Sequence, residues 1–215
     1  MTRSFSDIEL TAGSFYWFHG IVEDITDPLM MGRVRVRCIG YHNENKSQLP
    51  TASLPWALPV LPITSSSKTG VGISATGLAI DSWVVGFFRD GSAAQEPVII
   101  GSIATKTNGA YDIPIAARGT AIIGSTPAAY TDKIGPAYPY NKVTRTSSGH
   151  TIEYDDTPGK ERVALTHKSG STIQMLNDGT IVIASAGKDI EINAGTPGGS
   201  SGGDVIIKGK NIKLN

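Results

Sequence analysis

Three acidic residues that lie close together in the sequence are the first candidates for chemistry. Glu153, Asp155 and Asp156 fall within four positions. A pair of carboxylates can serve glycoside cleavage, and carboxylate oxygens are good ligands for hard cations. The spacing matches no standard calcium-binding loop, however, and the run Asp155-Asp156-Thr-Pro-Gly159 combines residues that favour a tight turn. We therefore interpret this segment as a hairpin turn.

A basic strand is the second candidate site. Arg33, Arg35 and Arg37 alternate with apolar residues, which is the pattern of a half-buried strand. On one face they would form a stripe that meets phosphates or a partner's carboxylates; the alternative is a solvated strand face. Few aromatic residues lie near the stripe in the sequence, and surfaces that bind single-stranded nucleic acid need aromatic platforms. Nucleic acid is therefore the least favoured ligand.

The other reactive residue types do not combine into a site. Cys38, the single cysteine, follows the alternating strand and is expected to point into a core. No Gly-x-Ser-x-Gly turn and no phosphate-binding glycine-rich loop occurs. The sequence thus predicts no enzyme, no cofactor and no metal site. The histidines are widely separated and lack the i, i+2 or i, i+4 spacing of metal ligands: His19, His42, His150 and His167.

Composition excludes several classes of protein. The 215 residues carry 19 Lys and Arg against 19 Asp and Glu, so the strong basic excess of a dedicated nucleic-acid binder is missing. No apolar run approaches the ~20 residues of a membrane-spanning helix, and the N-terminal residues lack the apolar stretch of a secretory signal. One cysteine cannot form a disulfide framework within the chain. The 25 glycines favour β structure with many turns.

The elements that must position these residues fall into three stretches. Residues 1–104 read as an N-terminal arm followed by a small closed β barrel or sandwich. Within them, Pro50–Ala75 holds four prolines and is expected to be a long ordered loop in which Trp56 is a packing anchor. Residues 105–147 read as an extended connector. The barrel strands are expected near Phe15–Val22, Arg33–Ile39, Trp83–Phe88 and Pro97–Gly101.

Residues 148–215 contain a short repeat. Pairs of apolar residues two positions apart recur at intervals of 8, 9, 15 and 7 residues, and the long interval contains a Gly- and Ser-rich insertion. A period near eight allows one short strand and one turn per unit. The residues predicted to form the core are Ile173, Met175, Ile181, Ile183, Ile190, Ile192, Val205, Ile207, Ile212 and Leu214.

Such short units need partners in order to fold. Burial of two isoleucine side chains gives only a few kcal/mol, whereas ordering eight residues costs about 1–2 kcal/mol for each backbone unit. Five pairs in a one-chain triangular solenoid would make fewer than two turns, and stable repeat arrays need about three or more stacked units. We therefore expect an intertwined homotrimer in which each chain supplies one face of a prism.

The order of motifs resembles a known family. Phe18-His-Gly-Ile-Val-Glu-Asp24, Gly32-Arg-Val-Arg-Val-Arg37 and Leu54-Pro-Trp-Ala-Leu-Pro59 resemble the N-terminal OB-fold domain of baseplate central spike proteins of contractile-tailed bacteriophages. His150-Thr-Ile-Glu-Tyr-Asp-Asp-Thr-Pro-Gly159 is similar to the entry of their triple-stranded β-helix, and to VgrG spikes of type VI secretion. The resemblance covers most of the chain except the connector.

The resemblance implies a trimeric spike in the virion baseplate that is made in the host cytoplasm and pierces the host envelope. It makes Arg33, Arg35, Arg37 and Trp56 candidate contacts to a trimeric hub protein. Some members insert a lysozyme domain where this chain has only the 43 residues 105–147, so muralytic activity is not expected. A VgrG-like spike, a single-stranded nucleic-acid-binding module and a glycan hydrolase remain as alternatives.

The resemblance also bears on the tip of the spike. Some spikes end in an iron-binding His-x-His apex, but no histidine follows His167 in this chain. A blunt end would expose the last apolar pair and its backbone groups. We therefore expect a separate PAAR-like tip protein to dock at Leu214 and Asn215.

Overall fold

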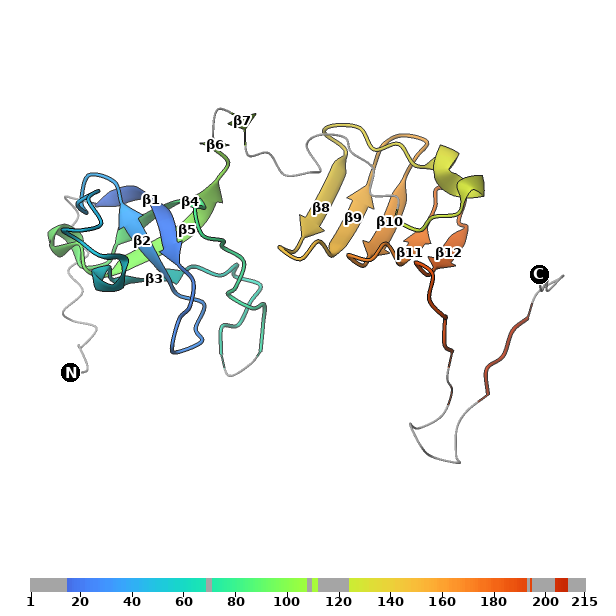
Figure 1. Ribbon diagram of the computed structural model, residues 1–215, viewed down its shortest axis with the longest axis horizontal. Coiled ribbons are helices and arrows are strands. Elements are labelled where there is room, and N and C mark those ends of the chain that lie inside the picture. Colours follow the sequence, from blue (N-terminus) through green and yellow to red (C-terminus); the bar gives the residue numbers. More distant parts are fainter. Residues whose placement is uncertain are drawn as a thin grey trace. The chain divides into compact units, whose positions relative to one another are not determined.

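The computed structural model describes residues 15–68, 71–107, 110–111, 124–192, 194 and 204–208. Within these residues the regular elements are β-strands and short 3-10 turns, which confirms the predicted all-β class. The chain divides into two compact units between Asp112 and Ile113 (Figure 1).

The first unit is a closed barrel of five strands in the order β1-β2-β3-β5-β4. Neighbouring strands run antiparallel, except that β3 and β5 run parallel. A two-stranded ladder of β6 and β7 follows it. The strands are β1 (Trp17–Asp24), β2 (Val34–Cys38), β3 (Trp56–Pro59), β4 (Trp83–Phe88), β5 (Pro97–Ile103), β6 (Lys106–Thr107) and β7 (Ala110–Tyr111), with 3-10 turns η2 (Thr51–Ser53) and η3 (Gly91–Ala93).

The barrel core follows from the period-two alternation of its strands. Gly86 lets β4, β5 and the core come close together, because a Cβ there would stand 2.0 Å from the Val98 carbonyl oxygen and 2.7 Å from the Phe18 ring. Cys38 is fully buried, and this burial raises the pKa of its thiol to about 12. The core residues are Phe18, Val22, Val34, Val36, Cys38, Ala57, Val84, Phe88 and Ile99.

The prediction of a continuous loop over Pro50–Ala75 is wrong at β3. Ala57 pairs with Val34 on β2, and Leu58 pairs in parallel with Val98 on β5, so this strand closes the barrel. Prolines remain compatible with it because the strand spans four residues and has Pro59 at its end. A very short strand between two others can thus form within a proline-rich segment.

The second unit is a five-stranded antiparallel sheet in the order β12-β11-β10-β9-β8. Each strand therefore pairs with the next in sequence, joined by short turns. The predicted turn after Asp155 is confirmed: the Thr157 amide donates to Asp155 Oδ1, and Gly159 has a φ of 75°. The elements are η5 (Ala128–Lys133), β8 (Asn141–Arg145), β9 (Thr151–Asp155), β10 (Arg162–Thr166), β11 (Thr172–Met175) and β12 (Ile181–Ala184).

The structure corrects the predicted connector at residues 105–147. Its last part is strand β8, whose Val143 pairs with Glu153, so the sheet begins before Ser148. The segment 124–140 lies against the same sheet rather than extending away from it. Its Ser125 amide donates to the Gly170 carbonyl at 2.6 Å, and the Ala137 amide donates to Thr157 Oγ1 at 2.9 Å. We call residues 124–140 the covering segment.

Candidate functional site

One face of the C-terminal sheet is apolar and exposed. Cross-strand register aligns its side chains in two rows, because Leu165 pairs with both Ile152 and Ile173, and Val163 pairs with both Tyr154 and Met175. These side chains retain between 44% and 62% of their accessible surface. We call this surface the open face; its residues are Ile152, Tyr154, Val163, Leu165, Ile173, Met175, Ile181 and Ile183.

The opposite face of the sheet is polar and buried. Asn141 Nδ2 donates to Glu153 Oε1 at 2.8 Å, and Arg162 pairs with Glu153 and donates to Gln174 Oε1 at 3.0 Å. Gln174 in turn donates to Thr126 of the covering segment. The sheet is thus inverted relative to an ordinary half-buried sheet: its polar side chains face the protein and its apolar side chains face outward.

Burial of this polar network has an electrostatic consequence. The side chains of Glu153 and Arg162 are almost inaccessible to solvent, at 1% and 0%. Desolvation raises the pKa of Glu153, although the Arg162 guanidinium opposes this shift. Since a buried charge is tolerated only with a partner, the Glu153–Arg162 pair depends on both members. The covering segment therefore protects an ion pair, and it leaves the open face uncovered.

A salt bridge and several hydrogen bonds fasten the covering segment to the turns of the sheet. Lys133 pairs with Asp178 in the β11–β12 turn, and Lys160 donates to the Asp132 carbonyl. Gly124 has a φ of 57°, and a Cβ there would stand 2.6 Å from the Gly170 carbonyl oxygen. Only glycine fits such a close approach in this conformation without strain. These contacts fix which face of the sheet is covered.

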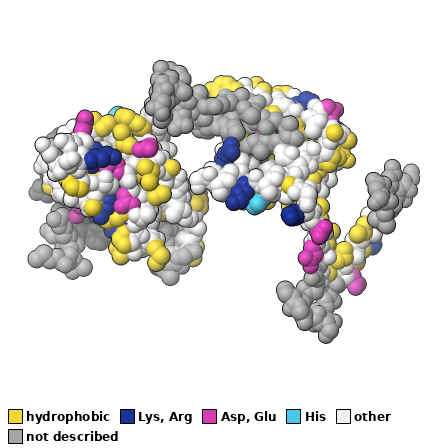
Figure 2. Space-filling model, in the orientation of Figure 1, with side chains coloured by type: hydrophobic (Ala, Val, Ile, Leu, Met, Phe, Trp, Pro, Cys, Tyr) yellow, Lys and Arg dark blue, Asp and Glu magenta, His cyan; other side chains and the backbone are white. Residues whose placement is uncertain are grey.

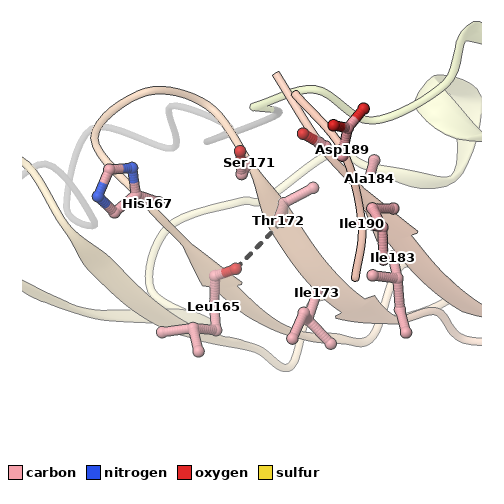
Figure 3. A pocket seen from close by; sticks show the side chains of 10 residues that line it. Leu165, His167, Ser171, Thr172, Ile173, Ile183, Ala184, Asp189 and Ile190 are labelled. Atoms are coloured by element: carbon pink, nitrogen blue, oxygen red, sulfur yellow. Dashed lines mark hydrogen bonds between the residues drawn. The ribbon is translucent and has the colours of Figure 1, made fainter. Parts of the chain in front are cut away.

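A groove of about 320 Å³ lies at the β12 end of the open face. Figure 3 shows Leu165, Ile173 and Ile183 directed to the same side of the strands, with Ile190 nearby. Ile190 belongs to the segment after β12, which has no strand partner in the described part of the chain. Figure 2 shows hydrophobic side chains along the described C-terminal segments beyond the sheet. The apolar surface therefore continues beyond the sheet.

The structure places the predicted core residues in three groups. Ile173, Met175, Ile181 and Ile183 share the open face. Ile190, Ile192, Val205 and Ile207 are exposed, with accessible fractions between 49% and 67%, in segments without strand pairing among the described residues. The remaining predicted residues, Ile212, Leu214 and the tip residue Asn215, lie outside the described residues.

The sequence interpretation missed half of the open face. Ile152 and Tyr154 on β9, and Val163 and Leu165 on β10, complete its two rows. Their signal was present as strict alternation in Thr151-Ile-Glu-Tyr-Asp155 and Arg162-Val-Ala-Leu-Thr166. Alternation alone predicts two faces but does not say which is covered.

The predicted open stripe of arginines is wrong. Arg33 pairs with Asp27 at 2.6 Å, and burial leaves Arg37 only 7% exposed. Arg37 forms a bidentate salt bridge with Glu23, with N–O distances of 2.8 and 3.0 Å, and this lowers the pKa of Glu23 to about 2. The three arginines are thus engaged within the barrel, where they anchor the β1–β2 and β2–β3 loops, and strand periodicity does not reveal these contacts.

Arg35 and Trp56, the other two predicted contact residues, are also engaged within the barrel. Arg35 donates to the Ala52 carbonyl at 2.5 Å and also to the Leu54 carbonyl. Its guanidinium carbon lies 4.4 Å from the centre of the Trp56 ring, and that of Arg33 lies 5.4 Å from it. The packing role expected for Trp56 is thus confirmed, and the indole stacks with these arginines.

The histidines and carboxylates do not form a metal centre among the described residues. The rings of His150 and His167 meet at 4.4 Å, but no group of three potential metal ligands occurs in the described ranges. Glu153 and Asp155 are buried on the polar face, and Asp156 pairs with Lys142 at the surface. No described helix has the length and hydropathy needed to cross a bilayer.

Comparison with known proteins agrees with the barrel. Residues 40–114 match the family described as Gp5 N-terminal OB domain. Protein Gp5 of Vibrio phage KVP40 is 30% identical over 250 aligned positions, which cover 83% of this chain and 59% of that protein. The pre-baseplate central spike protein Gp5 of Enterobacteria phage T4 is 42% identical over 88 positions, or 39% of this chain and 15% of that protein.

The chain thus spans less than two thirds of either relative. The KVP40 alignment is longer than this chain, so the relative has residues that this chain lacks. The T4 relative is named as a pre-baseplate central spike protein. The closed five-stranded barrel and these matches confirm the predicted resemblance: the chain is similar to the Gp5 proteins of two phages, and its residues 40–114 match the Gp5 N-terminal OB domain.

Proposed function

We propose that this chain is a structural, non-enzymatic central spike of a contractile phage tail, that its C-terminal part forms a homotrimer, and that the trimer pierces the host envelope. The observation that carries the proposal is the open face. Eight large apolar side chains in register are unusual on a free surface, and contiguous patches of this kind mark interfaces. The relationship to baseplate spike proteins supplies the context.

Three copies suit the open face and the segments that follow it. Each copy presents one apolar sheet face, and three faces placed around an axis enclose one shared interior. The segments around Ile190 and Ile207 have unpaired backbone in the described chain. In an intertwined trimer each such strand lies between strands of the other two copies, so no edge is left exposed. Two copies packed face to face would bury the open face but would not pair these single strands on both sides.

The mechanical function follows from this arrangement. Hydrogen bonds between copies prevent one chain from unfolding alone, so the shaft transmits axial force when a tail sheath contracts. The covering segment lies on the face opposite the shared interior, where it adds the buried Glu153–Arg162 network to the shaft wall. Apolar packing on the axis and a polar network outside it together resist bending.

The partners of the spike belong to the same proposal. The OB domain attaches to a trimeric hub protein in the baseplate, and a PAAR-like protein caps the end near Leu214 and Asn215. Because Arg33, Arg35 and Arg37 have partners inside the barrel, the hub contact needs other surface residues. A VgrG-like spike of a type VI or related injection system is the alternative function with the same architecture.

The solution mass of the full chain tests the proposal. One chain has a mass of 22.6 kDa, so sedimentation equilibrium should give about 68 kDa for three. A variant that ends at Asp112, the boundary of the first unit, should sediment as a single barrel. A full-length chain that stays at 22.6 kDa at micromolar concentration would refute the trimer, and one near 45 kDa would indicate two packed sheets instead.

A further inference from the structure

A hollow of about 420 Å³ lies on the outer surface of the barrel beside Trp83. Ile21 on β1 is the direct cross-strand neighbour of Trp83 on β4, and Ile39 lines the hollow from the end of β2. These three side chains supply its apolar surface. Charged groups complete the lining: Glu23, Arg37, Glu44, Lys46 and Asp81.

The charges around this hollow do not balance. Glu23 is paired with Arg37 at 2.8 Å and with Lys46 at 3.1 Å, which accounts for both cations. Glu44 and Asp81 are exposed and make no ion pair within the described part of the chain. Three carboxylates against two cations leave one net negative charge. The remaining titratable group, His42, is neutral at pH 7 because burial lowers its pKa.

Asp81 is held in a fixed place at the rim. It has a φ of 68°, a conformation that aspartate adopts more readily than most residues, and its amide donates to the Val22 carbonyl at 2.9 Å. It stands two residues before Trp83 at the start of β4. Asp81 and Trp83 thus line the same hollow from positions two residues apart in the chain.

The three tryptophans of the barrel differ in what covers their rings. Trp56 is approached by two guanidinium groups, and Trp17 packs against Phe15 at 4.9 Å and Phe87 at 6.3 Å. Trp83 has neither a cation nor an aromatic ring against it among the described residues. The Trp83 hollow thus combines an indole and carboxylates, the groups that recognise arginine, without an arginine against the indole.

We infer that this hollow receives an arginine side chain presented by a partner protein, with the guanidinium flat against Trp83 and its N–H groups directed to Glu44 and Asp81. A planar guanidinium stacks on indole and offers several donors, whereas an ammonium group offers a compact charge. The net negative charge disfavours phosphate and nucleic acid. That the partner is another protein of the baseplate rests on the proposed function; the chemistry of the hollow does not.

The experiment uses the full-length chain and two short peptides. Acetyl-Gly-Arg-Gly-amide is titrated while the indole N–H resonances of the three tryptophans are followed by 1H–15N NMR, and the citrulline peptide serves as its neutral counterpart. We expect one saturable shift, that of the Trp83 resonance, with the arginine peptide, and at least tenfold weaker binding of the citrulline peptide. Combined Asp81→Asn and Glu44→Gln should weaken binding about tenfold, because charge-assisted hydrogen bonds are lost.

A matched control is Asp132→Asn, an exposed carboxylate in the second unit, which should bind the arginine peptide as the unchanged chain does. Equal binding of the citrulline peptide, or unchanged binding by the double variant, would overturn the inference. A Trp83 resonance that moves on dilution of the protein alone would assign the hollow to a second copy and also overturn it. Arginine binding by a chain that sediments as a monomer would support the hollow while refuting the proposed trimer.

Discussion

Replacement of Ile183 by aspartate tests the open face most directly. The Ile183 side chain is 57% exposed in the single chain, and full burial of an isoleucine is worth about 1.5–3 kcal/mol. Burial of the remaining surface therefore contributes about 1–2 kcal/mol per copy, or about 3–5 kcal/mol in a trimer. The substitution removes this term and places three carboxylates in one apolar interior, where each unpaired charge costs several kcal/mol more. Together these changes are expected to prevent assembly.

Sedimentation equilibrium of the Ile183→Asp chain should then show a species of 22.6 kDa where the unchanged chain gives about 68 kDa. Lowering the pH toward 4 should restore part of the trimer, because a neutral carboxyl group is much less costly to bury. Ile63→Asp is the matched control: Ile63 is fully exposed in the barrel unit, and its replacement should leave the mass unchanged. A variant Ile183→Asp chain with unchanged mass and melting temperature would refute the assignment of the open face to a shared interior.

Three further perturbations test the barrel and the polar network. Gly86→Ala should lower barrel stability by several kcal/mol in chemical denaturation, since a methyl group has no room, whereas Gly101→Ala, with nothing within 4 Å, should cost under about 1 kcal/mol. Folding lowers the pKa of Glu23 from 4.5 to about 2. Its contribution of about 3 kcal/mol to the free energy of unfolding is therefore present above pH 4.5 and is lost as the pH falls toward 2. Glu23→Gln should flatten this part of the curve of stability against pH. Arg162→Met should cost about 3–5 kcal/mol at pH 7 by leaving Glu153 buried without its cation, and Glu153→Gln in the same chain should restore much of that loss in thermal melts.

The barrel was largely predictable because its strands carry strong local signals. Residues 83–88 and 97–103 combine β-branched and aromatic residues between turns, and their strands appear close to the expected positions. Strand β3 was not predictable in this way. Its four residues, Trp56–Pro59, gain their conformation from pairing with β2 and β5, and no local pattern distinguishes them from the surrounding loop.

The candidate site was predictable in its spacing but not in its surroundings. Apolar pairs such as Ile181 and Ile183 predicted one face of short strands, and the structure places them together. The sequence did not reveal that residues 124–140 cover the polar face, because the contacts involved, such as Gln174 to Thr126, join residues far apart. For the same reason the arginines of β2 were read as a surface: the loop carbonyls that accept from Arg35 and Arg37 come from other parts of the chain.

The position of Cys38 has a consequence for the handling of the molecule. Its thiol stays protonated at neutral pH and is sealed inside the barrel, so copies that come together do not cross-link through it. Alkylating reagents can reach the sulfur only when the barrel opens. The rate at which Cys38 is alkylated therefore reports how often the N-terminal barrel opens. Because Cys38 is the single cysteine, the measurement reports on that unit alone in the intact chain.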